Sequence, residues 1–135
     1  MGRYRKPVAP GAARFAGTPL ARVLGALTGR WSVLALEAVH EGCSHFNELQ
    51  RRLDGISHKV LVDTLRALQR DGFVHGPLTC EGRSEYRPTM LGAELVALIG
   101  GIRAWSDERG DELATVRARF EDGGLPSRAA GWSRA

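Results

Sequence analysis

Cysteine is scarce in this sequence, and long hydrophobic runs are missing. The two cysteines, Cys43 and Cys80, form neither a CxxC motif nor a Cys/His spacing typical of zinc sites. No apolar stretch approaches the roughly 20 residues that a membrane-spanning helix needs, and none follows the basic start of the chain as a secretory signal requires. We therefore expect a cytoplasmic protein with no metal site, no other cofactor and no membrane contact. The sequence leaves open whether either thiol senses oxidants.

Catalytic patterns are missing as well. The chain contains no phosphate-binding glycine loop and no recognisable Ser/His/Asp or Cys/His arrangement. The histidines that could serve in acid–base chemistry, His40, His45 and His58, lie outside any such motif. We expect a protein that is not an enzyme.

Acidic residues are missing from the chain up to Arg30, although basic residues recur there. The whole chain carries a net charge of +4, and acids outnumber bases between Arg103 and Asp122. Positive charge is therefore concentrated toward the beginning of the chain. This distribution is compatible with a polyanionic partner such as nucleic acid.

Length and composition indicate a single domain. With 135 residues, of which 43% are hydrophobic, the chain can close one modest core. Residues 1–17 are rich in Gly, Ala, Pro and Arg without apolar periodicity, which predicts a flexible basic arm. Residues 121–135 predict a disordered tail. The folded domain is expected over residues 18–109, with residues 110–120 as an extension of its last helix.

The first part of this domain predicts two helices. Thr18 is a good N-cap and Pro19 a good first helical residue, since proline lacks only an N–H that would be unpaired there. Apolar residues recur at helical spacing up to Leu27. A second, more apolar helix is expected over residues 31–40.

A helix-turn-helix pattern follows. Ser44 predicts the N-cap of a third helix, and the turn Asp54-Gly55-Ile56 separates it from Ser57, the expected cap of a fourth. At 100° per residue, one side of the fourth helix collects leucines and the opposite side collects cations. A charged face of this kind is typical either of a partner-binding surface or of a plain solvated one. The leucines are Leu61, Leu65 and Leu68, and the charged residues are Lys59, Asp63, Arg66 and Arg70.

Two short strands are predicted next, Phe73-Val74-His75 and Glu85-Tyr86-Arg87, joined by a polar loop that contains glycine. A hairpin placed directly after a helix-turn-helix is a wing. The order of elements therefore predicts a mainly α fold with a small β-hairpin, a winged helix-turn-helix.

The last predicted helix, capped by Thr89, has a wide apolar stripe that exceeds what so small a core can bury. We therefore expect a homodimer formed by N- and C-terminal dimerisation helices. The residues predicted for this contact are Leu20, Val23, Leu24, Leu27, Leu95, Leu98, Ile99, Ile102 and Trp105. Leu113, Val116 and Phe120 could extend the stripe.

Several motifs in order resemble those of HxlR-type winged-helix regulators, within the wider MarR-like group. They are LTGRWSVLAL (27–36), HFNEL (45–49), GISHKVL (55–61), LRALQRDGFV (65–74), Glu85-Tyr86 and Thr89-x-x-Gly92-x-x-Leu95. The resemblance covers roughly residues 18–109 and implies a homodimeric bacterial transcription factor whose terminal helices form the dimer.

Three positions depart from the pattern of that family. Thr18 stands where some members carry an oxidant-sensing cysteine, so that mechanism is in doubt in this chain. His45 stands where arginine is expected, and Gly76 where a basic residue often follows the strand. The wing also looks short.

The predicted DNA contacts follow from position in the helix-turn-helix. Residues at the start of the recognition helix reach base edges in the major groove, while residues further along it, in the wing and in the supporting helix contact the backbone. Arg83 at the wing could also enter the minor groove. The base-edge candidates are Ser57, His58, Lys59, Val62 and Asp63, and the backbone candidates are Arg51, Arg52, Arg66, Arg70 and Arg83.

The predicted function is that of a sequence-specific regulator of transcription. It would bind double-stranded DNA at an inverted-repeat operator, with repression the favoured mode. The alternative is a winged-helix protein-interaction module without specific DNA binding. The target genes, the operator sequence and any small-molecule effector stay open.

Overall fold

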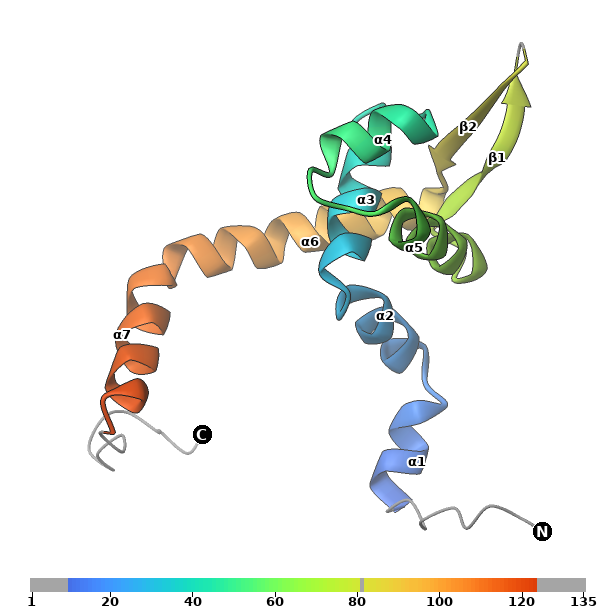
Figure 1. Ribbon diagram of the computed structural model, residues 1–135. Coiled ribbons are helices and arrows are strands. Elements are labelled where there is room, and N and C mark those ends of the chain that lie inside the picture. The colour runs from blue at the N-terminus through green and yellow to red at the C-terminus, as the bar shows by residue number, and fades with distance from the viewer. Residues whose placement is uncertain (1–9, 81, 124–135) are drawn as a thin grey trace, which may run out of the picture. The chain divides into compact units, whose positions relative to one another are not determined.

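The computed structural model describes residues 10–80 and 82–123, and the chain divides after Val96 into two compact units. Seven helices and one two-stranded antiparallel hairpin occur in the described residues, which confirms the predicted fold class (Figure 1). Among these helices none is long and apolar enough to cross a membrane. In chain order the elements are α1 (Pro10–Ala16), α2 (Pro19–Leu27), α3 (Arg30–His40), α4 (Phe46–Arg52), α5 (His58–Arg70), β1 (Val74–Cys80), β2 (Arg83–Pro88), α6 (Met90–Glu108) and α7 (Gly110–Glu121).

Three of the predicted helix starts are confirmed by side-chain hydrogen bonds. The Thr18 Oγ1 accepts from the N–H of Ala21 at 3.2 Å, and the Ser57 Oγ accepts from that of Val60 at 3.2 Å. The Thr89 Oγ1 accepts from the N–H of Gly92 at 2.9 Å. Each hydroxyl thereby satisfies an N–H that has no partner inside the helix.

The predicted cap at Ser44 is wrong, because α4 begins at Phe46 with His45 at its N-cap. The Ser44 carbonyl instead accepts a hydrogen bond of 2.7 Å from the N–H of Tyr86, and His45 forms an isolated β-bridge with Glu85. The segment before α4 is thus paired with β2. Because the paired residues lie far apart in the sequence, the local sequence around Ser44 does not indicate this pairing.

The ends of the chain differ in detail from the sequence analysis. Pro10–Ala16 form helix α1, where a flexible arm was predicted; the rest of that arm, residues 1–9, lies outside the described residues. Residues 110–120 belong to a separate helix, α7, because the helical run is interrupted at Arg109. Most of the predicted tail, residues 124–135, also lies outside the described residues.

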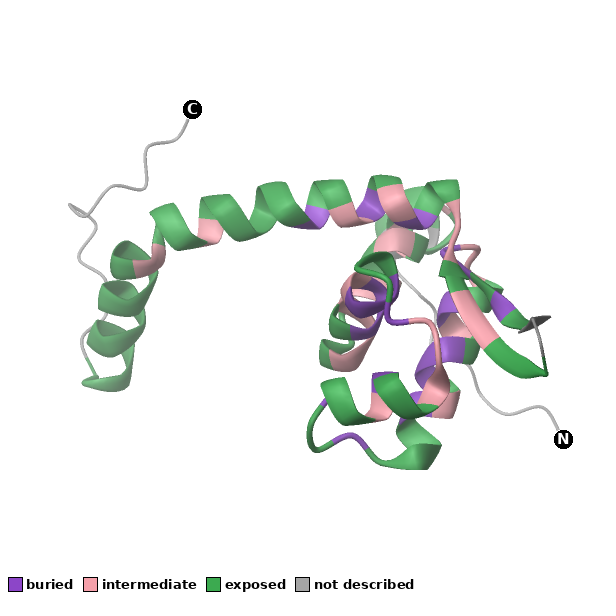
Figure 2. Cartoon of the chain, turned by 90° about the horizontal axis from the view of Figure 1, so that it is seen from above, coloured by how far each residue is buried: buried purple, intermediate pink, exposed green. Residues whose placement is uncertain are grey.

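The core of the first unit lies where α3, α4, α5 and the hairpin meet. α3 packs against α5, β2 and α4, and α5 packs against β1. Most of the buried residues, purple in Figure 2, gather at these contacts, and a few more lie on α6 (Met90–Glu108). The predicted leucine stripe of α5 is confirmed, because its three leucines are at most 2% exposed. The largest fully buried side chains are Leu36, Val39, Leu49, Leu61, Leu65, Leu68 and Val74.

The wing strands are longer than predicted. They pair from Val74 opposite Pro88 to Cys80 opposite Arg83, with an irregularity between His75 and Leu78. Gly76 lies in this irregular stretch with φ +131°, a conformation that side chains rarely adopt. A Cβ there would also lie 2.7 Å from the backbone oxygen of Glu85. Glycine at this position lets β1 pass close to β2.

Candidate nucleic-acid interface

Helix α5 presents a fixed polar face because its opposite face is anchored in the core. The leucine stripe is buried, and Thr64 is turned inward, where its hydroxyl donates to the Val60 carbonyl at 2.7 Å. On the outer side Lys59, Asp63 and Arg66 are all exposed. The helix therefore holds charged side chains at the surface on a rigid support.

The base-edge candidates at the start of α5 are largely accessible. Ser57, His58 and Lys59 are exposed, and Val62 is half-buried. The His58 ring contacts the Phe46 ring, with centroids 4.8 Å apart and planes inclined by 53°. This contact ties the first turn of α5 to α4, so His58 also has a structural role that the sequence did not indicate.

The backbone candidates divide by their ion pairs. Arg52 pairs with the Glu41 carboxylate, and the Arg70 Nε lies 3.3 Å from an Asp71 carboxylate oxygen. Such exposed pairs add little stability. Their carboxylates nevertheless offset part of the positive charge that these two arginines could offer to a phosphate. Within residues 10–80 and 82–123, no ion pair joins a carboxylate to the remaining candidate cations. These are Arg51, Lys59, Arg66 and Arg83.

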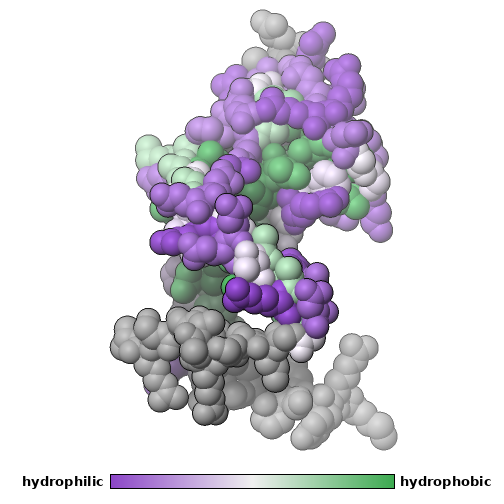
Figure 3. Space-filling view, turned by 90° about the vertical axis from the view of Figure 1, so that its left-hand side faces the viewer, coloured by the Kyte–Doolittle hydropathy of each residue, from purple (hydrophilic) through white to green (hydrophobic). Residues whose placement is uncertain are grey.

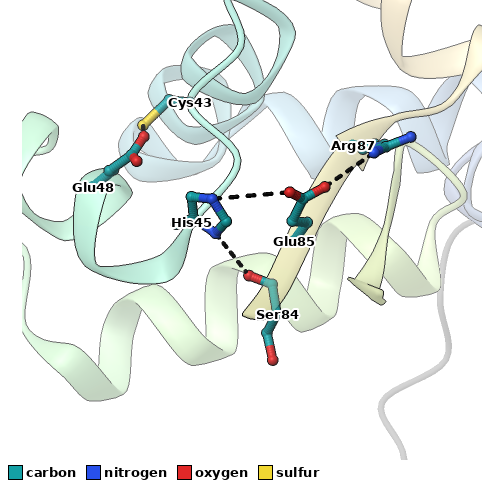
Figure 4. Close-up of polar contacts among 6 residues, drawn as sticks. All are labelled: Cys43, His45, Glu48, Ser84, Glu85 and Arg87. Atoms are coloured by element: carbon teal, nitrogen blue, oxygen red, sulfur yellow. Dashed lines mark hydrogen bonds and ion pairs between the residues drawn. The ribbon is translucent and has the colours of Figure 1, made fainter. Parts of the chain in front are cut away.

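His45 joins the helix-turn-helix to the wing (Figure 4). Its Nδ1 lies 3.3 Å from the Ser84 carbonyl oxygen, which can only accept, so this contact requires the proton on Nδ1. Its Nε2 lies 3.9 Å from Glu85 Oε1, while the other carboxylate oxygen of Glu85 accepts from Arg87 at 3.0 Å. The sequence did not place His45 in the site, and its pairing with β2 has no signature in the local pattern.

Tyr86 lies beside this junction, where its N–H donates to the Ser44 carbonyl. Burial raises the pKa of the Tyr86 phenol, and the Arg66 cation opposes the rise. A positive charge on α5 therefore acts on a side chain of the wing.

Cys43 is buried beside the helix-turn-helix, and its thiol donates a weak hydrogen bond to a Glu48 carboxylate oxygen at 3.9 Å (Figure 4). Burial raises the pKa of the Cys43 thiol and the Glu48 carboxylate raises it further, while Arg51 opposes them. Because the thiolate is the reactive form, Cys43 is poorly placed to sense oxidants. The side chain of Cys80 lies outside the described residues.

We predict that iodoacetamide alkylates Cys43 more slowly in the folded protein than in urea, and that the folded rate rises only at higher pH. Mass spectrometry measures the alkylation rate in a Cys80→Ser variant, in which Cys43 is the one remaining thiol. Equal folded and unfolded rates at neutral pH would contradict the prediction. A Glu48→Gln variant is the control, since removing the carboxylate should lower the pKa of the thiol and speed alkylation.

Acidic, histidine and cysteine side chains do not gather in threes at any point of the described chain, as a metal site would require. The described geometry instead offers an accessible recognition helix, a wing and uncompensated cations.

Comparison with known proteins agrees with this geometry. Residues 26–114 match the sequence pattern of the HxlR-like helix-turn-helix family. The HTH-type transcriptional regulator YtfH of Escherichia coli K12 is 34% identical over 102 residues, which cover 73% of this chain and 80% of that protein.

Solved structures show the same likeness. The transcriptional regulator YtfH of Salmonella typhimurium has a TM-score of 0.61 and 31% identity, covering 75% of this chain and 92% of its own. A protein assigned to the MarR family of regulators, from Enterococcus faecalis V583, has a TM-score of 0.63 and 25% identity. The match covers 84% of this chain and 99% of that protein. The chain therefore belongs to the HxlR-like helix-turn-helix family of DNA-binding transcriptional regulators.

Proposed function

We propose that the protein binds a specific double-stranded DNA sequence as a homodimer and represses transcription there. The observation that carries this proposal is the face of α5, where exposed Lys59, Asp63 and Arg66 stand opposite a fully buried leucine stripe. A helix of this kind can enter the major groove without disturbing its own core.

The start of α5 is proposed to read bases. The Lys59 ammonium can donate to guanine acceptors, the Asp63 carboxylate can accept from a cytosine amino group, and Val62 can touch a thymine methyl. Arg66, further along the helix, is better placed for a backbone phosphate. Base contacts set the sequence preference, and phosphate contacts set much of the affinity.

Dimerisation is proposed to bury apolar side chains that the single chain leaves exposed. Leu20 and Leu24 of α2 are exposed, and so are Leu98, Ile102 and Trp105 of α6, with exposed fractions of 55–65% in the α6 residues. In the space-filling view of Figure 3, hydrophobic side chains reach the surface between hydrophilic ones. Two of the predicted contact residues, Leu95 and Ile99, are already buried in the single chain.

The apolar face of α6 continues onto α7 within the second unit. Trp105 shares a groove of about 910 Å³ with Leu113, Val116 and Phe120. Each of these four side chains is at least half exposed. We propose that the two α5 helices of a two-fold dimer meet half-sites one turn of DNA apart, about 34–36 Å, which predicts an inverted-repeat operator.

We expect Trp105→Glu to raise the dimer dissociation constant by about thirtyfold or more, because a buried interface tryptophan commonly contributes about 2 kcal/mol or more. Sedimentation equilibrium measures the constant. Ala104→Glu adds the same charge at the neighbouring exposed position and should change it little. A Trp105→Glu variant as dimeric as the wild type would contradict this interface.

A reporter assay tests the regulatory mode. The operator selected from random DNA is placed between a promoter and a reporter gene, and the protein is expressed beside it. We expect the protein to lower reporter output from the intact operator. It should leave the output unchanged when the two half-sites are scrambled. Higher output with the intact operator would contradict repression, and unchanged output would contradict regulation at that site.

A further inference from the structure

A groove bordered by charged side chains lies between α4 and the beginning of β2. Its volume is about 480 Å³. Asn47 and Arg51 line it from α4, and Arg83 and Ser84 line it from the wing. Both arginines are exposed. Two guanidinium groups that are distant in sequence thus border the same hollow.

Both arginines are available to an external anion. In the described part of the chain neither Arg51 nor Arg83 forms an ion pair, whereas the adjacent Arg52 is paired with Glu41 and Arg87 with Glu85. The groove also contains one carboxylate, Glu48, which accepts a hydrogen bond from the Cys43 thiol. With two cations against one carboxylate, the charged lining is net positive.

The two walls of the groove are tied together by hydrogen bonds. The Tyr86 N–H donates to the Ser44 carbonyl at 2.7 Å, and the His45 imidazole contacts the Ser84 carbonyl at 3.3 Å. Figure 4 shows the His45 side chain reaching from the segment before α4 to Ser84 and Glu85 of strand β2. These ties fix the start of α4 against the start of β2, so the groove exists before any ligand binds.

We propose that this groove is a binding site for one phosphate group of the DNA backbone, held between Arg51 and Arg83. A guanidinium group presents a planar fork of donors that matches phosphate oxygens. The Asn47 amide and the Ser84 hydroxyl supply neutral donors beside them. The proposal rests on the proposed function, since α5 must occupy the DNA for the groove to meet the backbone. A shared phosphate joins the helix-turn-helix and the wing to the same point of the duplex.

A double-mutant cycle tests whether the two arginines bind one phosphate. Fluorescence anisotropy measures affinity of the full chain for the selected operator, for Arg51→Ala, Arg83→Ala and the double variant. Each single change should weaken binding about tenfold per protomer. The double variant should bind the operator only slightly more weakly than either single variant. The reason is that loss of one arginine already releases the phosphate that the other one shares. The exposed positions of both residues make the variants compatible with folding, which circular dichroism checks.

Salt dependence gives a second readout. The slope of log affinity against log salt should fall by about one per protomer in the double variant, and by about two if each arginine held its own phosphate. Arg51→Ala combined with Arg66→Ala is the matched control. Those two cations are proposed to contact different phosphates, so the fold losses of operator affinity from the two single changes should multiply.

The outcomes separate this proposal from the proposed function. If the wild type binds the operator and the losses at Arg51 and Arg83 multiply, the shared phosphate is overturned while DNA binding stands. Unchanged operator affinity in the double variant would also overturn it, and if inorganic phosphate then stabilised the wild type alone, the groove would bind a free anion. If the wild type binds no duplex, the proposed function and this site both fail.

Discussion

Gly92→Ala is expected to lower the free energy of unfolding by about 3 kcal/mol. This should be among the largest losses of stability from a glycine-to-alanine change in this chain. A Cβ at this position would lie 2.1 Å from the backbone oxygen of Phe73 and 3.0 Å from its carbonyl carbon. The obstacle is backbone and not the movable end of a side chain. Either α6 or the turn before β1 must shift to admit it.

The hydrogen bonds around Gly92 make that shift costly. The Thr89 hydroxyl donates to the Gly72 carbonyl at 2.7 Å and accepts from the Gly92 N–H, while the Thr89 N–H donates to Phe73 at 3.1 Å. These bonds join the start of α6 to the end of α5. The spacing Thr89-x-x-Gly92 is therefore a packing requirement, because residue 89 caps the helix and residue 92 gives the backbone room to approach.

Urea unfolding followed by circular dichroism measures this effect, with Gly100→Ala as the matched control. Gly100 lies in the same helix, and an added Cβ would meet nothing within 4 Å. Alanine should there leave stability unchanged or raise it by up to about 1 kcal/mol, its advantage over glycine in a helix. A Gly92→Ala variant as stable as the control would show that the close approach of α6 to Phe73 is wrong.

Lys59→Ala is expected to cost about 1–3 kcal/mol of operator binding per half-site, the value of a good contact to a base edge. Lys59 is exposed in the first turn of α5, where side chains reach the bases of the major groove. Binding to a scrambled duplex should change much less. The measurement is the ratio of operator affinity to scrambled-duplex affinity at fixed salt.

Arg66→Ala is the control for loss of a positive charge from the same face of α5. Because Arg66 is proposed to contact a phosphate, its removal should weaken both duplexes alike and lower the salt slope by about one per protomer. The ratio of the two affinities should then stay near that of the wild type. Equal losses on both duplexes after Lys59→Ala would refute its role in reading bases.

Local sequence signals predicted the parts of the fold that depend on near neighbours. The caps at Thr18, Ser57 and Thr89 and the leucine stripe of α5 depend on residues within a few positions, and all are confirmed. The pairing of Ser44 with Tyr86 depends on residues far apart in the chain. The sequence therefore predicted a cap at Ser44, where tertiary pairing prevails over cap preference.

The candidate site shows the same division. The exposed charges of α5 follow from helical periodicity once the leucine stripe is recognised. The ion pairs of the supporting helix do not follow from periodicity, because Arg52 of α4 pairs with Glu41 at the end of α3. The meeting of Arg51 and Arg83 at one groove likewise depends on how the wing folds back onto α4.

The central claim is that α5 gives this regulator its sequence preference as part of a symmetric dimer. The most direct measurement is selection of bound duplexes from a random DNA library near physiological salt, for the wild type and for a Lys59→Ala/Arg66→Ala variant. The account predicts that the wild type enriches an inverted repeat and that the variant does not. Weak, equal binding of the wild type to every duplex would contradict the account and favour a winged-helix module that binds protein.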